Sequence, residues 1–88
     1  MPKRPSRFYV YIVECADGTF YTGCTSDLER RLKKHNSGKG AKYLRGRCPV
    51  RLIYAKRCAS FGSALKTEIR IKALSHEEKR KVVSTRVL

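Results

Sequence analysis

Two short segments with the composition of β-strands, separated by a turn signal, constrain the fold of this chain most. Residues 8–13 read Phe-Tyr-Val-Tyr-Ile-Val, which is β-branched and aromatic throughout and is typical of a buried strand. Asp17-Gly18 indicates a hairpin turn, and residues 20–22, Phe-Tyr-Thr, form the returning strand. The chain therefore begins with a β-hairpin.

The length of the hairpin loop decides which side chains share a face. A two-residue loop would place Tyr11 and Tyr21 on opposite faces of the sheet. A three-residue loop over residues 16–18, with Gly18 in the left-handed conformation, pairs Val13 with Tyr21 and Tyr11 with Gly23. We favour the three-residue loop, which gathers the tyrosines of both strands on one face.

The remaining pattern predicts three helices and one more strand. Ser26 and Glu29 form a candidate capping box for a helix that ends at residues 36–38. Residues 40–47 allow a short helical turn, 50–58 a third strand, 61–74 a long helix, and 75–83 a last helix. The order β-β-α-β-α-α indicates an α/β protein on a small antiparallel sheet. At 88 residues it is a single domain, 1–88, with its core over about 8–83.

Charge is concentrated in the middle of the chain. The formal net charge is +14, and between Arg30 and Lys66 there are twelve Lys or Arg and no Asp or Glu. Such a surface attracts polyanions, and nucleic acid is the partner it fits best; a charge kept only for solubility is the alternative. The candidate phosphate contacts are Lys34, Lys39, Lys42, Arg45 and Lys72.

Glu68 is the first acid after that stretch. The helix over 61–74 is expected to bury Phe61, Ala64, Leu65, Ile69 and Ile71, and the helical wheel places Glu68 near the centre of this apolar stripe. A buried carboxylate is costly unless it is paired or binds a metal. Glu68 is therefore either a salt-bridge partner of Lys72 or Arg31, or a ligand for Mg²⁺ or Mn²⁺ with waters and a substrate phosphate completing the shell.

Arg31 and His35 lie four residues apart, on one face of the first helix. Arg31 could stabilise charge on a phosphate, and His35 could transfer or orient a proton. The competing interpretation of His35 is a hydrogen-bonded core histidine.

Other features exclude whole classes of protein. No apolar run approaches the length of a membrane span, and the basic residues 1–7 are not followed by the apolar segment of a signal peptide. The four cysteines form no C-x-x-C pair, so a zinc ribbon is not indicated, and reduced thiols fit the cytoplasm. We expect a monomer without membrane contact.

Taken together, the residues resemble the GIY-YIG nuclease family, in particular its small stand-alone single-domain members. The resemblance rests on Tyr9-Val10-Tyr11, on Tyr21-Thr22-Gly23 ten residues later, and on Arg31, His35 and Glu68 at the expected offsets. The first triplet has Tyr-Val-Tyr in place of Gly-Ile-Tyr, and no Asn follows Glu68.

The resemblance implies a three-stranded antiparallel sheet flanked by helices, and metal-dependent phosphodiester hydrolysis. By this resemblance, Tyr11 or Tyr21 is the general base, Arg31 contacts the scissile phosphate and His35 supports the base. Glu68 ligates Mg²⁺ or Mn²⁺, and Gly23 allows a close backbone approach. Neighbouring cations are expected to lower the pKa of the tyrosine base.

Two functions follow for testing. The first is a divalent-metal-dependent endonuclease acting on DNA in preference to RNA, either structure-selective or weakly specific. The alternative is a non-catalytic basic nucleic-acid-binding module on the same fold. For the enzyme, we expect Tyr11, Tyr21, Arg31, His35 and Glu68 to line one solvent-open pocket.

Overall fold

A computed structural model describes residues 7–86 and has the expected order of elements. The strands and helices, in chain order, are β1 (Phe8–Glu14), β2 (Phe20–Thr25), α1 (Leu28–Asn36), the 3-10 turn η1 (Lys42–Leu44), β3 (Arg51–Cys58), α2 (Phe61–Lys72) and α3 (His76–Thr85). No helix within residues 7–86 is long and apolar enough to cross a membrane.

The three strands form one antiparallel sheet in the order β2-β1-β3. Val13 pairs with Tyr21 and Tyr11 with Gly23, which is the register that the three-residue hairpin loop predicts. Gly18 has φ +84°, a left-handed conformation that favours glycine, and its N–H donates to the Cys15 carbonyl over 2.9 Å. Local turn chemistry therefore places Tyr11 and Tyr21 on the same face.

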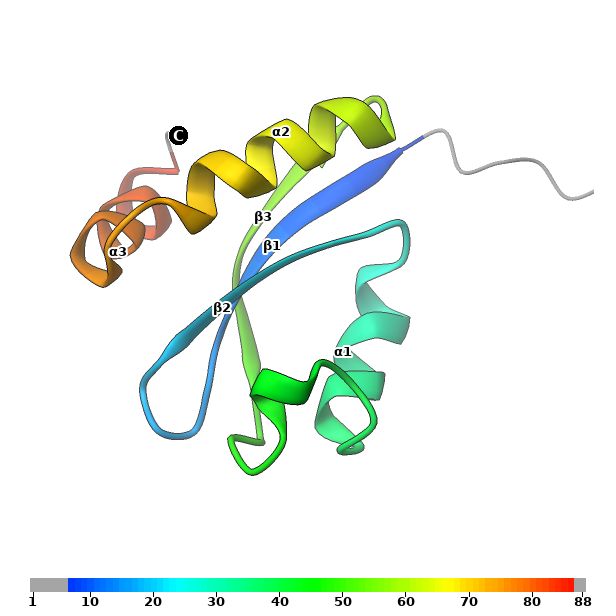
Figure 1. Cartoon of the computed structure of the whole chain (residues 1–88), viewed down its shortest axis with the longest axis vertical. Helices are drawn as coiled ribbons and strands as arrows, with labels where there is room; N and C mark the ends of the chain where they lie inside the picture. Colours follow the sequence, from blue (N-terminus) through cyan, green and yellow to red (C-terminus); the bar gives the residue numbers. More distant parts are fainter. Residues whose placement is uncertain (1–6, 87–88) are drawn as a thin grey trace, which may run out of the picture.

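Helices cover both faces of the sheet, giving three layers (Figure 1). On one face, α2 and α3 pack Ala64, Ile71 and Val82 against Val10 and Ile12 of β1. On the other face, α1 and η1 cover a second apolar cluster, whose fully buried members are Tyr11, Val13, Cys15, Leu44 and Val50. The alternation of β1 side chains between the two clusters is the period-two pattern of a central strand. The candidate site therefore belongs to the α1 layer, except for Glu68.

Helix α1 begins one residue later than its capping signal suggested. Asp27, and not Ser26, is the N-cap, and its carboxylate accepts a hydrogen bond from the Arg30 N–H over 3.1 Å. The Thr25 hydroxyl accepts from the Asp27 N–H and so fixes the entry of the chain. The capping box predicted at Ser26 is thus wrong.

The buried face of helix α2 differs from the face that the helical wheel predicted. Ala64, Thr67 and Ile71 are buried, whereas Phe61, Leu65 and Ile69 are 56%, 41% and 62% exposed. Ala64 and Ile71 are both 0% exposed and belong to the apolar cluster between this helix and the sheet. Glu68 lies at the border of this buried face, with 15% of its side chain exposed.

Candidate active site

A hydrogen bond between Tyr11 and His35 forms the centre of the candidate site. The Tyr11 hydroxyl lies 2.8 Å from Nε2 of His35, and each residue is only 1% exposed. The Tyr11 ring lies across Gly23, where an added Cβ would come within 2.6 Å of Tyr11 Cζ. Gly23 therefore provides the room in which the Tyr11 hydroxyl reaches α1.

His35 is held on its other side by the loop that follows α1. The Ala41 N–H donates to Nδ1 of His35 over 3.4 Å, and a Cβ on Gly40 would come within 2.7 Å of the His35 Cα. A ring nitrogen that accepts a hydrogen bond carries no proton, so neutral His35 bears its proton on Nε2 and donates it to the Tyr11 oxygen. Sequence reasoning missed Gly40, because nothing in residues 37–40, Ser-Gly-Lys-Gly, marks which glycine packs against a side chain.

The segments around His35 are tied together by side-chain-to-backbone bonds. Asn36 Nδ2 donates to the Val50 carbonyl over 3.2 Å, and the Val50 N–H donates to Asn36 Oδ1 over 2.7 Å. The Cys48 thiol donates to the His35 carbonyl over 3.0 Å. These contacts fix the end of α1 against the start of β3, and with it the position of the His35 ring.

Burial sets the protonation state of the pair. Burial, and then the neighbouring Tyr21, raise the pKa of Tyr11 above its usual range, and the opposing effect of Arg31 is smaller. Arg31 does lower the pKa of Tyr11, as expected of a nearby cation, but burial outweighs this effect and the net pKa is raised. The pKa of His35 is lowered by burial, and further by Arg31 and Lys34. At neutral pH both groups are uncharged.

Tyr21 contacts the same histidine through its ring. The Tyr21 and His35 rings meet edge to face, with centroids 5.7 Å apart. Tyr43 of η1 stacks on Tyr21 at 5.9 Å, and the Arg47 guanidinium lies 4.4 Å from the centroid of the Tyr43 ring. Sequence reasoning missed Tyr43 and Arg47. The one feature of the sequence that could have indicated them is their position in the stretch between Arg30 and Lys66 that contains no acid.

Glu68 approaches from the opposite layer of the protein. Its Oε2 lies 3.5 Å from Nζ of Lys72, so the two residues form an ion pair. A salt bridge with Lys72 was one of the alternatives expected for Glu68. Its negative charge contributes to raising the pKa of Tyr11, and after burial it is the largest cause of the raised pKa of Cys24. Glu68 and Tyr11 therefore lie within electrostatic reach of each other.

The side chains present suit a metal ion only when it is shared with a substrate. Within residues 7–86, no group of three His, Cys, Asp or Glu side chains could hold an ion. Mg²⁺ is commonly bound by one or two carboxylates, with waters and substrate phosphates completing its shell. Glu68, largely buried and paired only with the half-exposed Lys72, fits the protein's part of such a site.

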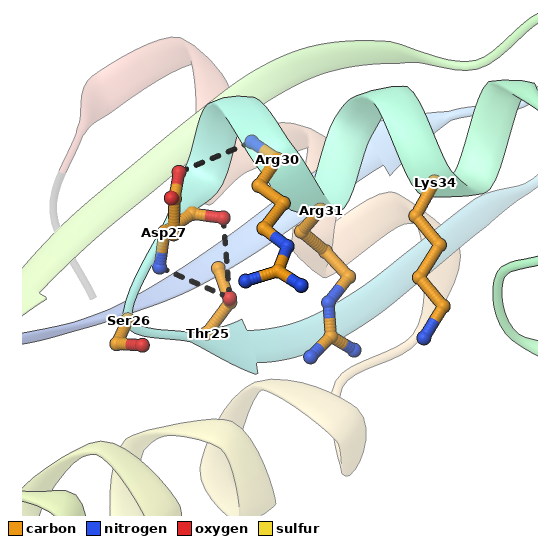
Figure 2. Close-up of a pocket in the computed structure, with 6 residues that line it drawn as sticks. All are labelled: Thr25, Ser26, Asp27, Arg30, Arg31 and Lys34. Carbon is orange, nitrogen blue, oxygen red and sulfur yellow. Dashed lines mark hydrogen bonds between the residues drawn. The ribbon is translucent and has the colours of Figure 1, made fainter.

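A cleft of about 350 Å³ opens at the start of α1 (Figure 2). It is lined by Thr25, Ser26, Asp27, Arg30, Arg31 and Lys34. Of the five residues expected in one open pocket, only Arg31 lines this cleft. Tyr11 and His35 are buried, Tyr21 is partly buried against the same apolar cluster as Tyr11, and Glu68 comes from the other layer. The prediction of a single open pocket is therefore wrong in this respect: packing closes over the Tyr11–His35 pair.

The five lysines and arginines expected to bind nucleic acid fall into three places. Lys34 lines the cleft, and Lys72 is paired with Glu68. Lys39, Lys42 and Arg45 are exposed in the segment that joins α1 to β3. Arg30 was not singled out from the sequence, although it lies next to Arg31 at the start of the acid-free stretch.

Comparison with known proteins places this arrangement in a family. The profile of the GIY-YIG catalytic domain matches residues 7–81. The chain is 53% identical to UPF0213 protein BH0048 of Halalkalibacterium halodurans over 76 residues, which is 86% of this chain and 81% of that protein. It is 51% identical to UPF0213 protein VNG_2274C of Halobacterium salinarum over 71 residues, 81% of this chain and 92% of that protein.

Solved structures agree with the sequence matches. The solution NMR structure of BH0048 superposes with a TM-score of 0.60 at 51% identity, covering 90% of this chain and 84% of that chain. The NMR structure of protein EF2693 from E. faecalis gives a TM-score of 0.64 at 41% identity, with the same two coverages. The chain therefore belongs to the GIY-YIG family of nuclease domains and is similar to its small UPF0213 members.

Proposed function

We propose that this protein is a divalent-metal-dependent endonuclease that hydrolyses phosphodiester bonds in DNA. The observation that carries the proposal is the buried Tyr11–His35 hydrogen bond beside Arg31, with the carboxylate of Glu68 in electrostatic reach of Tyr11. A tyrosine oxygen, an imidazole, a guanidinium and a carboxylate together provide a base, its support, a phosphate contact and a metal ligand.

In this mechanism the phenolate form of Tyr11, and not Tyr21, takes the proton from the attacking water. Its oxygen accepts the Nε2–H of His35, and a hydrogen bond to the ionised form of a group favours ionisation. Tyr21 contacts His35 only through its ring. As the water oxygen bonds to phosphorus, the P–O bond to the sugar oxygen breaks and that oxygen leaves with the electron pair and takes a proton from solvent. Arg31 stabilises the charge on the phosphate.

A metal ion bound by Glu68 would stabilise negative charge on the phosphate oxygens as a Lewis acid. The Glu68 carboxylate would hold that ion, and Lys72, paired with its Oε2 over 3.5 Å, would lie beside it. Because the nucleophile is water, the mechanism needs no ribose 2′-hydroxyl, so DNA, which lacks that group, can serve as the substrate. Repulsion between chains of net charge +14 favours a monomer, and four free cysteines suit the cytoplasm.

The alternative is a module of the same fold that binds nucleic acid without cleaving it. The Glu68–Lys72 ion pair and the raised pKa of Tyr11 favour this alternative. In this state the carboxylate is paired with a lysine and the tyrosine carries its proton, so neither is ready for catalysis. Both functions predict salt-sensitive binding, so binding alone does not separate them.

A cleavage assay separates the two functions. Purified protein is incubated with Mg²⁺ or Mn²⁺ and with duplex, branched and single-stranded DNA and RNA. We expect nicking of DNA that is lost in Glu68→Ala and Glu68→Gln while binding persists. The matched control is Glu77→Ala, which removes an exposed carboxylate in the first turn of α3. Equal inactivity of the wild type and Glu68→Ala on every substrate would leave the binding module as the function.

A further inference from the structure

We propose that the cleft at the start of α1 is a track for the DNA backbone, in which Arg30 and Lys34 bind the phosphates on either side of the one contacted by Arg31. This inference rests on the proposed function for the identity of the central phosphate. The inference adds two points to that function. The bound strand would follow the axis of α1, and Arg30 and Lys34 would hold it.

Three cations of α1 converge on this cleft. The side chains of Arg30, Arg31 and Lys34 extend from the helix to the same side and line the cleft together (Figure 2). Like charges in one cleft repel one another, so this arrangement is unfavourable until an anion neutralises it. The positive charge of the cleft therefore favours the binding of an anionic ligand.

The acid in the cleft, Asp27, forms no ion pair with these cations. Among residues 7–86, no ion pair joins Arg30, Arg31 or Lys34 to an acidic side chain. The Asp27 carboxylate is instead used as the N-cap, accepting the Arg30 N–H. By contrast, Lys33 on the same helix is paired with Glu29 and does not line the cleft. The three cationic groups therefore remain available to a ligand.

The spacing suits a chain of phosphates better than a single anion. Arg30 and Lys34 are one turn apart, about 6 Å along the helix axis. To bind a single inorganic phosphate, all three cationic groups would have to meet at one point. A nucleic-acid strand instead presents a row of charges, which the cations can contact separately. The guanidinium groups of Arg30 and Arg31 can each bind a phosphate through two N–H groups, and Lys34 acts as a point charge.

The cleft also adjoins the buried pair. The charge of Arg31 acts on both Tyr11 and His35, and that of Lys34 acts on His35. His35 belongs to the same helix as Arg31 and Lys34, so a phosphate bound at Arg31 would lie on the helix that carries the histidine of the buried pair, with Arg30 and Lys34 to either side.

The salt dependence of binding tests the proposal without any need for cleavage. Binding of a fluorescent 14-base-pair duplex is measured by anisotropy, without divalent metal, from 50 to 300 mM KCl. Each phosphate contact contributes about 0.9 to the slope of log K against log [salt] for duplex DNA. We expect Arg30→Ala and Lys34→Ala each to reduce the slope by about 0.9, and the double variant by about 1.8. The control, Lys33→Ala, should leave the slope unchanged because Glu29 already neutralises Lys33.

The outcomes are distinct. A double variant with the wild-type slope, or a Lys33→Ala slope reduced as much as those of the cleft variants, overturns the track. Displacement of the duplex by millimolar inorganic phosphate at constant ionic strength also overturns it, because the cleft would then be a site for the free anion. Circular dichroism confirms folding, and Arg30→Gln repeats the test with a longer side chain. If the slopes change as expected but no variant or wild type cleaves DNA, the track stands and the endonuclease proposal fails.

Discussion

The Tyr11 hydroxyl and Nε2 of His35 lie 2.8 Å apart, in a bond that joins the central strand β1 to helix α1 across 24 residues of sequence. The bond lies in the second apolar cluster, away from water. It is therefore both a tertiary contact that fixes α1 on the sheet and the polar centre of the candidate site. Variants that disturb it should separate these two roles.

Removal of the Tyr11 hydroxyl should affect catalysis far more than stability. Tyr11→Phe keeps the ring but removes the base, so we expect cleavage to fall by about 10²–10⁴-fold, the usual contribution of a general base. The His35 Nε2–H loses its partner, which costs about 1–3 kcal/mol of stability. Tyr21→Phe is the matched control and should retain most activity, since Tyr21 contacts His35 through its ring. Single-turnover cleavage and urea unfolding measure the two effects; equal losses in both variants would contradict the assignment of Tyr11.

Cleavage should rise with pH through the neutral and mildly alkaline range. The pKa of Tyr11 is raised, so below it the reactive phenolate fraction grows about tenfold per pH unit. We expect the logarithm of the single-turnover rate to increase with pH between 7 and 9 in the wild type. The residual rate of Tyr11→Phe should be flat over the same range. A flat wild-type profile would show that the ionisation of Tyr11 does not limit the reaction.

A methyl group at Gly23 should displace the Tyr11 ring. Its Cβ would lie within 2.6 Å of Tyr11 Cζ, so Gly23→Ala forces that ring to move and lengthens the bond to His35. We expect a loss of activity greater than about tenfold and a loss of stability of about 1–3 kcal/mol, typical of overpacking. Gly62→Ala is the control, because a Cβ there meets nothing within 4 Å and alanine favours a helix. That control should keep full activity and gain up to about 1 kcal/mol; a neutral Gly23→Ala would contradict the close approach.

The Thr22 hydroxyl is a stability defect in the core. Among the described residues, Thr22 Oγ1 is the buried side-chain polar atom without a hydrogen-bond partner. Thr22→Val replaces that hydroxyl with a methyl group of similar size and removes the cost of burying it. We expect stability to rise by about 1 kcal/mol, measured by urea unfolding, with binding unchanged. Thr19→Val at the half-buried hairpin should instead lose stability, because the Thr19 hydroxyl donates to Asp17 over 2.6 Å.

Stability should depend on the protonation of His35. Its pKa is lowered in the folded protein, so the unfolded chain, with a pKa of about 6.5, binds a proton more readily. This contribution to stability is present above pH 6.5 and is lost as pH falls from there through the lowered folded value. His35→Gln removes the titration and should flatten the curve between pH 7 and 5. The control is His76→Gln, since His76 is exposed on the surface of α3; an unchanged slope in His35→Gln would assign the pH dependence to other groups.

The features predicted correctly from the sequence are those that depend on neighbours in the chain. The three-residue loop and its left-handed Gly18 determined the register that places Tyr11 opposite Gly23. Helix α3 begins where a last helix was expected from residue 75, at a capping box of Ser75 and Glu78 in which both hydrogen bonds are present. Turn and cap chemistry act within a few residues and are therefore visible in a linear sequence.

The tertiary structure decided what depends on packing between distant segments. It turned Phe61 and Ile69 of α2 to solvent, and it buried Tyr11 deeply enough for desolvation to outweigh the charge of Arg31. It also brought Gly40 against His35. The sequence by itself determined the strands, the tyrosine face and the family, whereas protonation states and close approaches were decided by which layers cover which side chains. Desolvation and steric contact arise only when residues far apart in the chain exclude water between them.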